Sequence, residues 1–356
     1  MNYSHLENYY KGKNVFLTGH TGFKGSWMLC WLHLLGAKVK GYALAPQTED
    51  DLYNVINGNE LCESIIADIR DKKKLEQEII DFQPDFIFHL AAQPLVRLSY
   101  EIPAETFEVN VMGTANVLDA LRKIEKPCVA VMITTDKVYE NKEWHYPYRE
   151  SDRLGGYDPY SASKAAAELV INSYRNSFFN THNYQNHLKS IASARAGNVI
   201  GGGDWAKDRI IPDTVRALKN GESILVRNPN AVRPWQHVLE PVSGYLHLAT
   251  KMVDEPIKYT SAWNFGPNQE DNLTVKEIAE KAIKIWGNGK FHTPKSDQPL
   301  HEAKLLKLDI NKTVNELEWQ PKMNASKAIQ WTIEFYKNNS ILNSVKIFNQ
   351  INEYQK

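Results

Sequence analysis

The chain has little cysteine, no excess of either charge and no long apolar run. Its three cysteines, Cys30, Cys62 and Cys128, stand far apart among apolar neighbours, which favours reduced, buried thiols over a disulfide framework or a zinc site. Lys plus Arg and Asp plus Glu number 42 each. The basic excess that nucleic-acid binders usually show is therefore missing, and we expect no nucleic-acid partner and no metal.

No stretch approaches the roughly 18 consecutive apolar residues that a membrane-spanning helix needs. The start, MNYSHLENYYKGKN, lacks the apolar run of a signal peptide. We therefore expect a cytoplasmic protein with no membrane partner. With 42% hydrophobic and 24% charged residues, the composition is that of an ordinary globular protein, which excludes a wholly disordered or fibrous chain.

Short apolar runs alternate with segments of helical period in the first part of the chain. We predict strands over 14–18, 38–44, 64–67, 85–90, 128–134 and 190–194, and helices over 24–35, 72–82, 103–124 and 159–178. This alternation is typical of an α/β protein with a doubly wound parallel sheet of the Rossmann type.

The pattern changes after residue 196. A loop rich in Gly and Asp is followed by predicted helices over 212–219, 241–252, 274–286 and 326–337. We expect a first domain over 1–196 and a smaller mixed α/β substrate-binding lobe over 197–338, with some elements that return to the first domain. The polar tail over 339–356 is expected to fray.

A glycine-rich turn, TGHTGFKG, joins the first predicted strand to the first predicted helix. Such a turn needs backbone freedom, and a pyrophosphate needs both close backbone approach and a helix N-terminus. The strand–turn–helix context favours a dinucleotide site over a plain glycine turn. Two readings stay open for His20 and Lys24: they modulate phosphate binding, or they are solvated surface side chains. The predicted cofactor residues of this loop are Gly19, His20, Thr21, Gly22, Phe23, Lys24 and Gly25.

Tyr160 and Lys164, in YSASK, open the helix that follows the fifth strand. Positions i and i+4 share one helical face, and an ammonium near a phenol lowers the phenol pKa towards neutrality. The phenolate can then accept a proton from a substrate hydroxyl while a hydride leaves. A surface pair is the alternative, but the glycine turn upstream favours the catalytic interpretation.

Thr135, Asp136 and Lys137 follow the fifth strand, and the carboxyl ends of strands hold the chemistry of doubly wound sheets. An acid beside a base suits elimination of water, because one protonates the leaving hydroxyl and the other removes a C–H proton. The alternative is an ordinary Asp-Lys turn. We favour the catalytic interpretation because of the position at the strand end.

The motifs TGHTGFKG, YSASK and TTDKVYEN together resemble the extended short-chain dehydrogenase/reductase superfamily and, within it, the nucleotide-sugar 4,6-dehydratases. HLAAQPLVRLSY and ARAGNVIGGGDWAKDRIIPD resemble the branch of that family that acts on CDP-glucose. The resemblance implies NAD as cofactor, CDP-glucose as substrate and a role in deoxysugar and surface polysaccharide biosynthesis. No acidic residue follows the second strand, so that position alone does not select NAD over NADP.

The resemblance also implies roles for single residues. It gives oxidation at C4 to Thr135, Tyr160 and Lys164, the C5 proton to Lys137 and the leaving hydroxyl at C6 to Asp136. Further cofactor contacts fall on Asp68, Ile69, Leu90, Ala91, Ala92 and Asn110. Guanidinium, amide and imidazole groups suit a nucleotide sugar, and the predicted substrate residues are Gln93, Asn198, Arg209, Arg233, His237 and His301.

Two other functions stay open, an epimerase or reductase of the same superfamily and a dinucleotide-binding protein without turnover. The helices over 103–124 and 159–178 carry apolar residues on more than one face, and members of the superfamily pair these helices across a two-fold axis. We therefore predict a homodimer or a dimer of dimers. The apolar residues of these two helices are Phe107, Val111, Val117, Leu121, Leu169 and Tyr174.

Trp205 and Trp235 could stack on a base or pack in the core of the second lobe, and packing is favoured for both.

Overall fold

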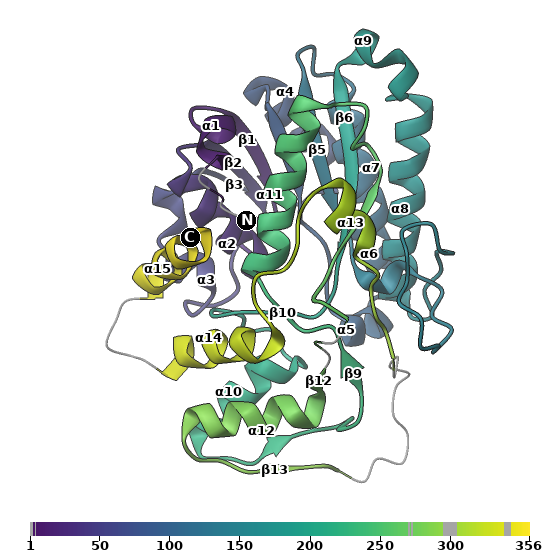
Figure 1. Ribbon diagram of the computed structural model, residues 1–356. Helices are drawn as coiled ribbons and strands as arrows, with labels where there is room; N and C mark the ends of the chain where they lie inside the picture. The colour runs from purple at the N-terminus through teal and green to yellow at the C-terminus, as the bar shows by residue number, and fades with distance from the viewer. Residues whose placement is uncertain (1–2, 4, 270, 272, 295–304, 338–342) are drawn as a thin grey trace.

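A seven-stranded parallel sheet forms the centre of the computed structural model, which describes residues 3, 5–269, 271, 273–294, 305–337 and 343–356 (Figure 1). The strand order is β11-β6-β5-β4-β1-β2-β3, and every neighbouring pair is parallel. The predicted doubly wound fold is confirmed. The strands are β1 (Asn14–Thr18), β2 (Lys38–Ala43), β3 (Glu63–Ile66), β4 (Phe86–His89), β5 (Cys128–Ile133), β6 (Lys189–Ala196) and β11 (Ala262–Phe265).

Helices cover both faces of this sheet (Figure 1). Val15 and Leu17 of β1 belong to one hydrophobic core, and Phe16 between them belongs to the other, because side chains alternate along a strand. The first core includes α2 (Phe23–Leu34), α11 (Leu239–Asp254) and α15 (Asn343–Gln355), and the second includes α4 (Lys72–Phe82), α7 (Gly113–Leu121) and α8 (Pro159–Ser177).

The predicted helix over 103–124 is not a single regular helix. It consists of α6 (Pro103–Phe107), a π-helical turn, η2 (Glu108–Met112), and α7. Such π turns occur often at functional sites, and this one carries Asn110.

The second lobe lies below the carboxyl edge of the sheet in Figure 1. It contains α10 (Ile210–Asn220), α12 (Val275–Trp286) and α14 (Ala325–Lys337). Three short strand pairs connect them: β7 (Val199–Ile200) with β10 (Gln236–His237), β9 (Val232–Arg233) with β12 (Leu273–Thr274), and β8 (Ile224–Leu225) with β13 (Phe291–His292).

The tail does not fray as expected. Residues 343–355 form α15, whose buried Ile347, Ile351 and Tyr354 pack in the core beside α2. Apolar burial outweighs the polar composition of this segment, and the expectation of a frayed end was wrong for it.

The remaining short helices are α1 (Leu6–Tyr10), α3 (Leu52–Val55), η1 (Gly58–Glu60), α5 (Val96–Glu101), η3 (Asp136–Val138), η4 (Thr181–Asn183), α9 (Tyr184–His187) and α13 (Asn311–Glu316).

Among the residues described, no helix combines the length and the apolar character that crossing a membrane requires. The cysteines are free thiols, of which Cys30 and Cys128 are buried and Cys62 is half-buried.

Candidate active site

The glycine turn lies between β1 and α2, where the strand order reverses. Gly19 has φ +75°, and a Cβ on it would lie 2.7 Å from the Ala91 nitrogen. A Cβ on Gly25 would lie 2.0 Å from the Gly19 carbonyl oxygen. No side chain caps the N-terminus of α2 at Gly22. The turn thus brings an open helix N-terminus to the crevice where doubly wound sheets bind dinucleotides.

His20 is buried against β2 rather than solvated. Its Nε2 lies 2.7 Å from the Ser64 hydroxyl, and a Cβ on Gly41 would lie 2.4 Å from the ring. Burial lowers the pKa of His20 to about 4, so the imidazole is neutral near pH 7. The interpretation of His20 as a solvated surface side chain was wrong.

Lys24 is also partly buried, and it extends towards the catalytic candidates. Its Nζ donates to the Tyr245 hydroxyl at 3.3 Å. Burial, followed by the charges of Arg209 and Lys164, lowers the pKa of Lys24 to about 7. Lys24 is therefore not a solvated surface side chain either. Its amine lies inside the site, near enough to Arg209 and Lys164 for their positive charges to act on it.

The first two turns of α8 hold Tyr160 and Lys164. Asp158 caps this helix by accepting from the Ser161 nitrogen at 2.9 Å. Lys164 Nζ donates to the Ile133 carbonyl at 3.5 Å, which places it beneath the end of β5. Burial lowers the pKa of Lys164 to about 8.

The phenol of Tyr160 departs from expectation. Burial raises the pKa of Tyr160 to about 12, although a hydrogen bond with Thr135 acts in the opposite direction. The predicted decrease towards neutrality is therefore wrong for the chain as it stands. Burial removes water from the phenolate, and this destabilises the charged form more than the hydrogen bond with Thr135 stabilises it.

A turn of 3₁₀ helix, η3, follows β5 and brings the predicted acid and base together. The Thr135 hydroxyl donates to Asp136 Oδ1 at 2.9 Å, and Lys137 Nζ lies 3.6 Å from the same oxygen. Asp136 is fully buried, whereas 27% of the Lys137 side chain is exposed. Asp136 Oδ2 is buried without a hydrogen-bond partner among the described residues. The pair therefore presents a buried acid beside a more accessible amine.

The ends of β3 and β4 carry further predicted cofactor residues. The Asp68 carboxylate accepts from Arg70 at 2.6 Å, and this guanidinium lowers the pKa of Asp68. Ile69 is buried, and a Cβ on Gly113 would clash with it at 2.3 Å. The next segment lines the same edge, because the Thr18 hydroxyl accepts from the nitrogens of Leu90 and Ala91 at 3.1 Å each, with Ala92 following them.

Asn110 connects this segment to α8. Its Oδ1 accepts from the Gln93 nitrogen at 2.9 Å, and its Nδ2 donates to the Ser163 hydroxyl at 2.8 Å. The Gln93 side chain accepts from the Leu95 nitrogen and donates to the Thr106 hydroxyl. Both side chains therefore hold the loop in place, and their contacts with ligands remain predictions.

The predicted substrate residues divide into two groups. Arg209 pairs with Asp204 at 2.9 Å, and its charge acts on Tyr160, so it borders the site. Asn198 has φ +46° and a buried Nδ2 without a described partner. Arg233 lies in β9, half-buried. These three remain binding candidates.

The two histidines do not strengthen the substrate site. His237 is fully buried between Trp27 and Trp331, with ring centroids 5.6 and 5.8 Å away, and burial lowers its pKa to about 3. It is a core side chain in this fold. His301 lies outside the described residues.

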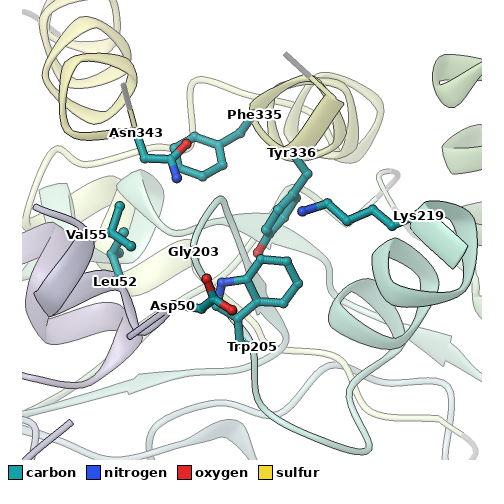
Figure 2. Close-up of a pocket in the computed structure, with 9 residues that line it drawn as sticks. All are labelled: Asp50, Leu52, Val55, Gly203, Trp205, Lys219, Phe335, Tyr336 and Asn343. Atoms are coloured by element: carbon teal, nitrogen blue, oxygen red, sulfur yellow. The ribbon is translucent and has the colours of Figure 1, made fainter. Parts of the chain in front are cut away.

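Trp205 is half-buried and packs against Tyr336 of α14. It meets Tyr336 edge-on at 5.1 Å and lines a small hollow of about 40 Å³ with Lys219 and Asp50 (Figure 2). Trp235 is buried, and its Nε1 donates to the Leu273 carbonyl at 3.2 Å. Packing is thus confirmed for Trp235, and for Trp205 it stays a prediction.

Sequence reasoning missed a buried ion pair beneath the site. Arg195 of β6 pairs with Glu168 of α8 at 2.8 Å, with side-chain exposures of 4% and 2%. The Thr134 hydroxyl donates to the same carboxylate at 2.6 Å. An arginine inside a fully buried strand requires a buried acid as its partner. The sequence offered Glu168, one helical turn after Lys164, as the acid from which this pair could have been predicted.

Comparison with known proteins decides the family. The family model described as GDP-mannose 4,6 dehydratase matches residues 16–332. The chain belongs to this family. The assignment to the nucleotide-sugar dehydratase branch of the extended short-chain dehydrogenases/reductases, made from the motifs, is thereby confirmed.

Individual relatives agree with this family. The chain is 49% identical to the CDP-glucose 4,6-dehydratase of Salmonella typhimurium, over 93% of this chain and 92% of the relative. It is 29% identical to the dTDP-glucose 4,6-dehydratase of Streptomyces antibioticus, over 92% and 93%. A solved dTDP-glucose 4,6-dehydratase from Streptomyces venezuelae superposes with a TM-score of 0.78 at 23% identity, over 92% of this chain and 97% of that one, which supports the fold.

Proposed function

We propose that this member of the GDP-mannose 4,6-dehydratase family is an NAD-dependent CDP-glucose 4,6-dehydratase, a hydro-lyase that forms CDP-4-keto-6-deoxyglucose. The observation that carries the proposal is the Asp136–Lys137 pair at the end of β5, 3.6 Å apart and next to the first two turns of α8, which hold Tyr160 and Lys164. The 49% identity to a CDP-glucose 4,6-dehydratase supports the choice of nucleotide.

The residues present fit a dinucleotide. The turn is closed so tightly at Gly19 and Gly25 that a Cβ at either position would clash with the backbone. The uncapped N-terminus of α2 that follows suits a pyrophosphate. When bound, NAD⁺ supplies a hydride acceptor for C4 and later returns that hydride to C6. We assign the phosphates to the turn from Gly19 to Gly25, adenine to Asp68 and Ile69, and the nicotinamide side to Leu90, Ala91, Ala92 and Asn110.

The chain's own groups move the protons. Tyr160, in its phenolate form, takes the proton of the 4-hydroxyl as the C4 hydride departs. Burial in the chain alone raises the pKa of Tyr160, so we assign the stabilisation of the phenolate to a charged Lys164 below it and to the positive charge of a bound nicotinamide, with Thr135 as hydrogen-bond partner. The resulting ketone acidifies C5. Lys137 removes the C5 proton, and Asp136 donates a proton to the C6 hydroxyl, which leaves as water. The hydride and a proton then add at C6 and C5, so the sum of the steps is the loss of one water.

The rival functions fit less well. An epimerase or reductase needs Tyr160 and Lys164 but not an acid and a base together at positions 136 and 137. A dinucleotide-binding protein without turnover needs none of these groups. The intact set of side chains, on the neighbouring segments η3 and α8, supports the dehydratase.

The proposal extends to assembly and location. We place a two-fold interface on α6, η2 and α8, whose surface exposes Phe107, Met112 and Leu169. Val117 and Leu121, two of the apolar residues of these helices, are fully buried in the second core and lie on the face that covers the sheet. We propose a cytoplasmic homodimer, or a dimer of such dimers, that supplies deoxysugars for surface polysaccharide.

The direct test is turnover. The purified protein is incubated with NAD⁺ and, separately, with CDP-, dTDP-, UDP- and GDP-glucose, and the absorbance of a 4-keto-6-deoxysugar is measured in alkali. We expect product from CDP-glucose in preference to the other three. Product from none of them, or inversion at C4 without loss of water, would contradict the proposal.

A further inference from the structure

Gly197, just after β6, lies directly behind the carboxyl group of Asp136. A Cβ on Gly197 would lie 1.8 Å from Oδ2, 2.1 Å from Cγ and 2.5 Å from Oδ1 of Asp136, and these are its three nearest atoms. Gly197 does not have a positive φ, so its backbone conformation is open to other residues. The requirement for glycine at this position is therefore one of space for the carboxyl group.

Neighbouring contacts hold the backbone of Gly197 in place. Its carbonyl accepts from Gln236 Nε2 at 3.1 Å, and the preceding strand is anchored by the Arg195–Glu168 pair. A side chain at 197 would therefore have to displace Asp136. The Asp136 Oδ2 that faces this position is buried without a described partner, and a polar atom in that state lacks the bond that usually compensates burial.

We infer that Gly197 is a positioning residue for the elimination step. It reserves the place of the Asp136 carboxyl group, from which, in the proposed function on which this inference rests, the acid reaches the leaving hydroxyl at C6. The nearest atoms to an added methyl belong to Asp136 and to neither Tyr160 nor Lys164. A methyl here should therefore impair elimination more than oxidation, which it reaches only through the hydrogen bond from Thr135 to Asp136.

The kinetic test uses Gly197→Ala in single turnover with CDP-glucose and NAD⁺. We expect NADH absorbance to appear at close to the wild-type rate, while formation of the 4-keto-6-deoxysugar slows by ~10²-fold or more, as for loss of a general acid. The matched control is Gly155→Ala, whose added Cβ meets its nearest atom, Glu140 Cβ, at 3.4 Å. Wild-type dehydration by Gly197→Ala, or an equal loss in both steps, would overturn the inference.

A second test needs no substrate. Unfolding by urea is compared for the wild type, Gly197→Ala, Asp136→Ala and the double variant. We expect Gly197→Ala to destabilise the wild type but to be close to neutral when Asp136 is already alanine, because the clash is then gone. Folding of the double variant where Gly197→Ala alone fails to fold would also support the inference, whereas equal costs in both backgrounds would overturn it.

The two tests separate this inference from the proposed function. If the wild type makes no keto sugar but the unfolding measurements show coupling between positions 136 and 197, the proposed function fails and the placement of the carboxyl group stands. If the wild type dehydrates CDP-glucose and the two positions are uncoupled, the proposed function stands and the role of Gly197 is overturned.

Discussion

At the scale of single residues, Lys137 is the sharpest test of the division of labour. Lys137→Met removes the proposed base and keeps a chain of similar length. We expect bound NADH and a 4-keto-glucose to accumulate, and exchange of the C5 proton with heavy water to slow by ~10²–10⁴-fold. The control is Lys142→Met, which alters a half-exposed pair with Glu140. If Lys137→Met exchanges the C5 proton at the wild-type rate, Lys137 is not the base, and Asp136 and Lys137 form only an ordinary turn.

Asp136→Asn probes the acid in the same assay. Because the C5 proton is assigned to Lys137, exchange at C5 is expected to continue while dehydration slows by ~10²–10⁴-fold. Mass spectrometry of the recovered sugar nucleotide after deuterium labelling separates the two. If exchange and dehydration decline by the same factor, Asp136 has no separate role in protonating the leaving group.

Tyr160→Phe deletes the proton acceptor of the first step and keeps the ring. All later steps depend on the 4-ketone, so NADH formation, C5 exchange and product should decline together, by ~10²–10⁴-fold. Tyr157→Phe serves as control, since Tyr157 is 76% exposed. Continued NADH formation at the wild-type rate in Tyr160→Phe would remove the tyrosine from the mechanism.

At the scale of elements, α8 and β6 are joined by the Glu168–Arg195 pair beneath the site. Glu168→Gln leaves the Arg195 guanidinium buried without an opposite charge, and breaking a buried pair in this way costs about 3–5 kcal/mol. Equilibrium urea unfolding should show this loss. The control Glu255→Gln disrupts an exposed pair with Lys258 and should leave the midpoint unchanged. Equal midpoints for both variants would contradict the assigned importance of the pair.

At the scale of the whole molecule, the proposed dimer depends on an apolar face. Leu169 is 61% exposed on α8, and a carboxylate there would face its two-fold mate across the interface. We expect Leu169→Asp to halve the mass measured by light scattering at micromolar concentration. Ile257→Asp, at a 52% exposed position outside that face, should keep the wild-type mass. A monomeric wild type would contradict the assembly.

Glu240 links distant parts of the chain. Its carboxylate accepts from the Tyr354 hydroxyl of α15 at 2.7 Å and from the Met323 nitrogen at 2.8 Å. Burial raises the pKa of Glu240 from 4.5 to about 7. The folded state therefore keeps a proton that the unfolded state loses, and the stability from this group, full below pH 4.5, is lost as pH rises to about 7.

Glu240→Gln isolates this contribution, because the amide does not titrate. Urea unfolding of both proteins between pH 4.5 and 8 should show the wild type losing stability relative to the variant up to about pH 7, with a constant difference above it. Parallel stability profiles across that window would show that Glu240 keeps an ordinary pKa in the fold.

Local sequence alone determined much of this protein. Periodicity located β1, β5 and α8, and i, i+4 spacing put Tyr160 and Lys164 on one helical face, because these features depend on neighbours within a few residues. The glycine turn was predictable from its own glycine spacing, although the close approach of Ala91 to Gly19 was not. Domain limits and residue roles stay predictions that await the experiments above.

Only the tertiary structure decided where side chains from distant segments meet. His237 became a core residue because Trp27 and Trp331 close around it, and the polar tail became a helix because α15 buries three side chains in the core beside α2. The raised pKa of Tyr160 and the place of Gly197 behind Asp136 have the same origin. Burial and contact are properties of the packed chain, and a sequence pattern does not encode the desolvation that they impose.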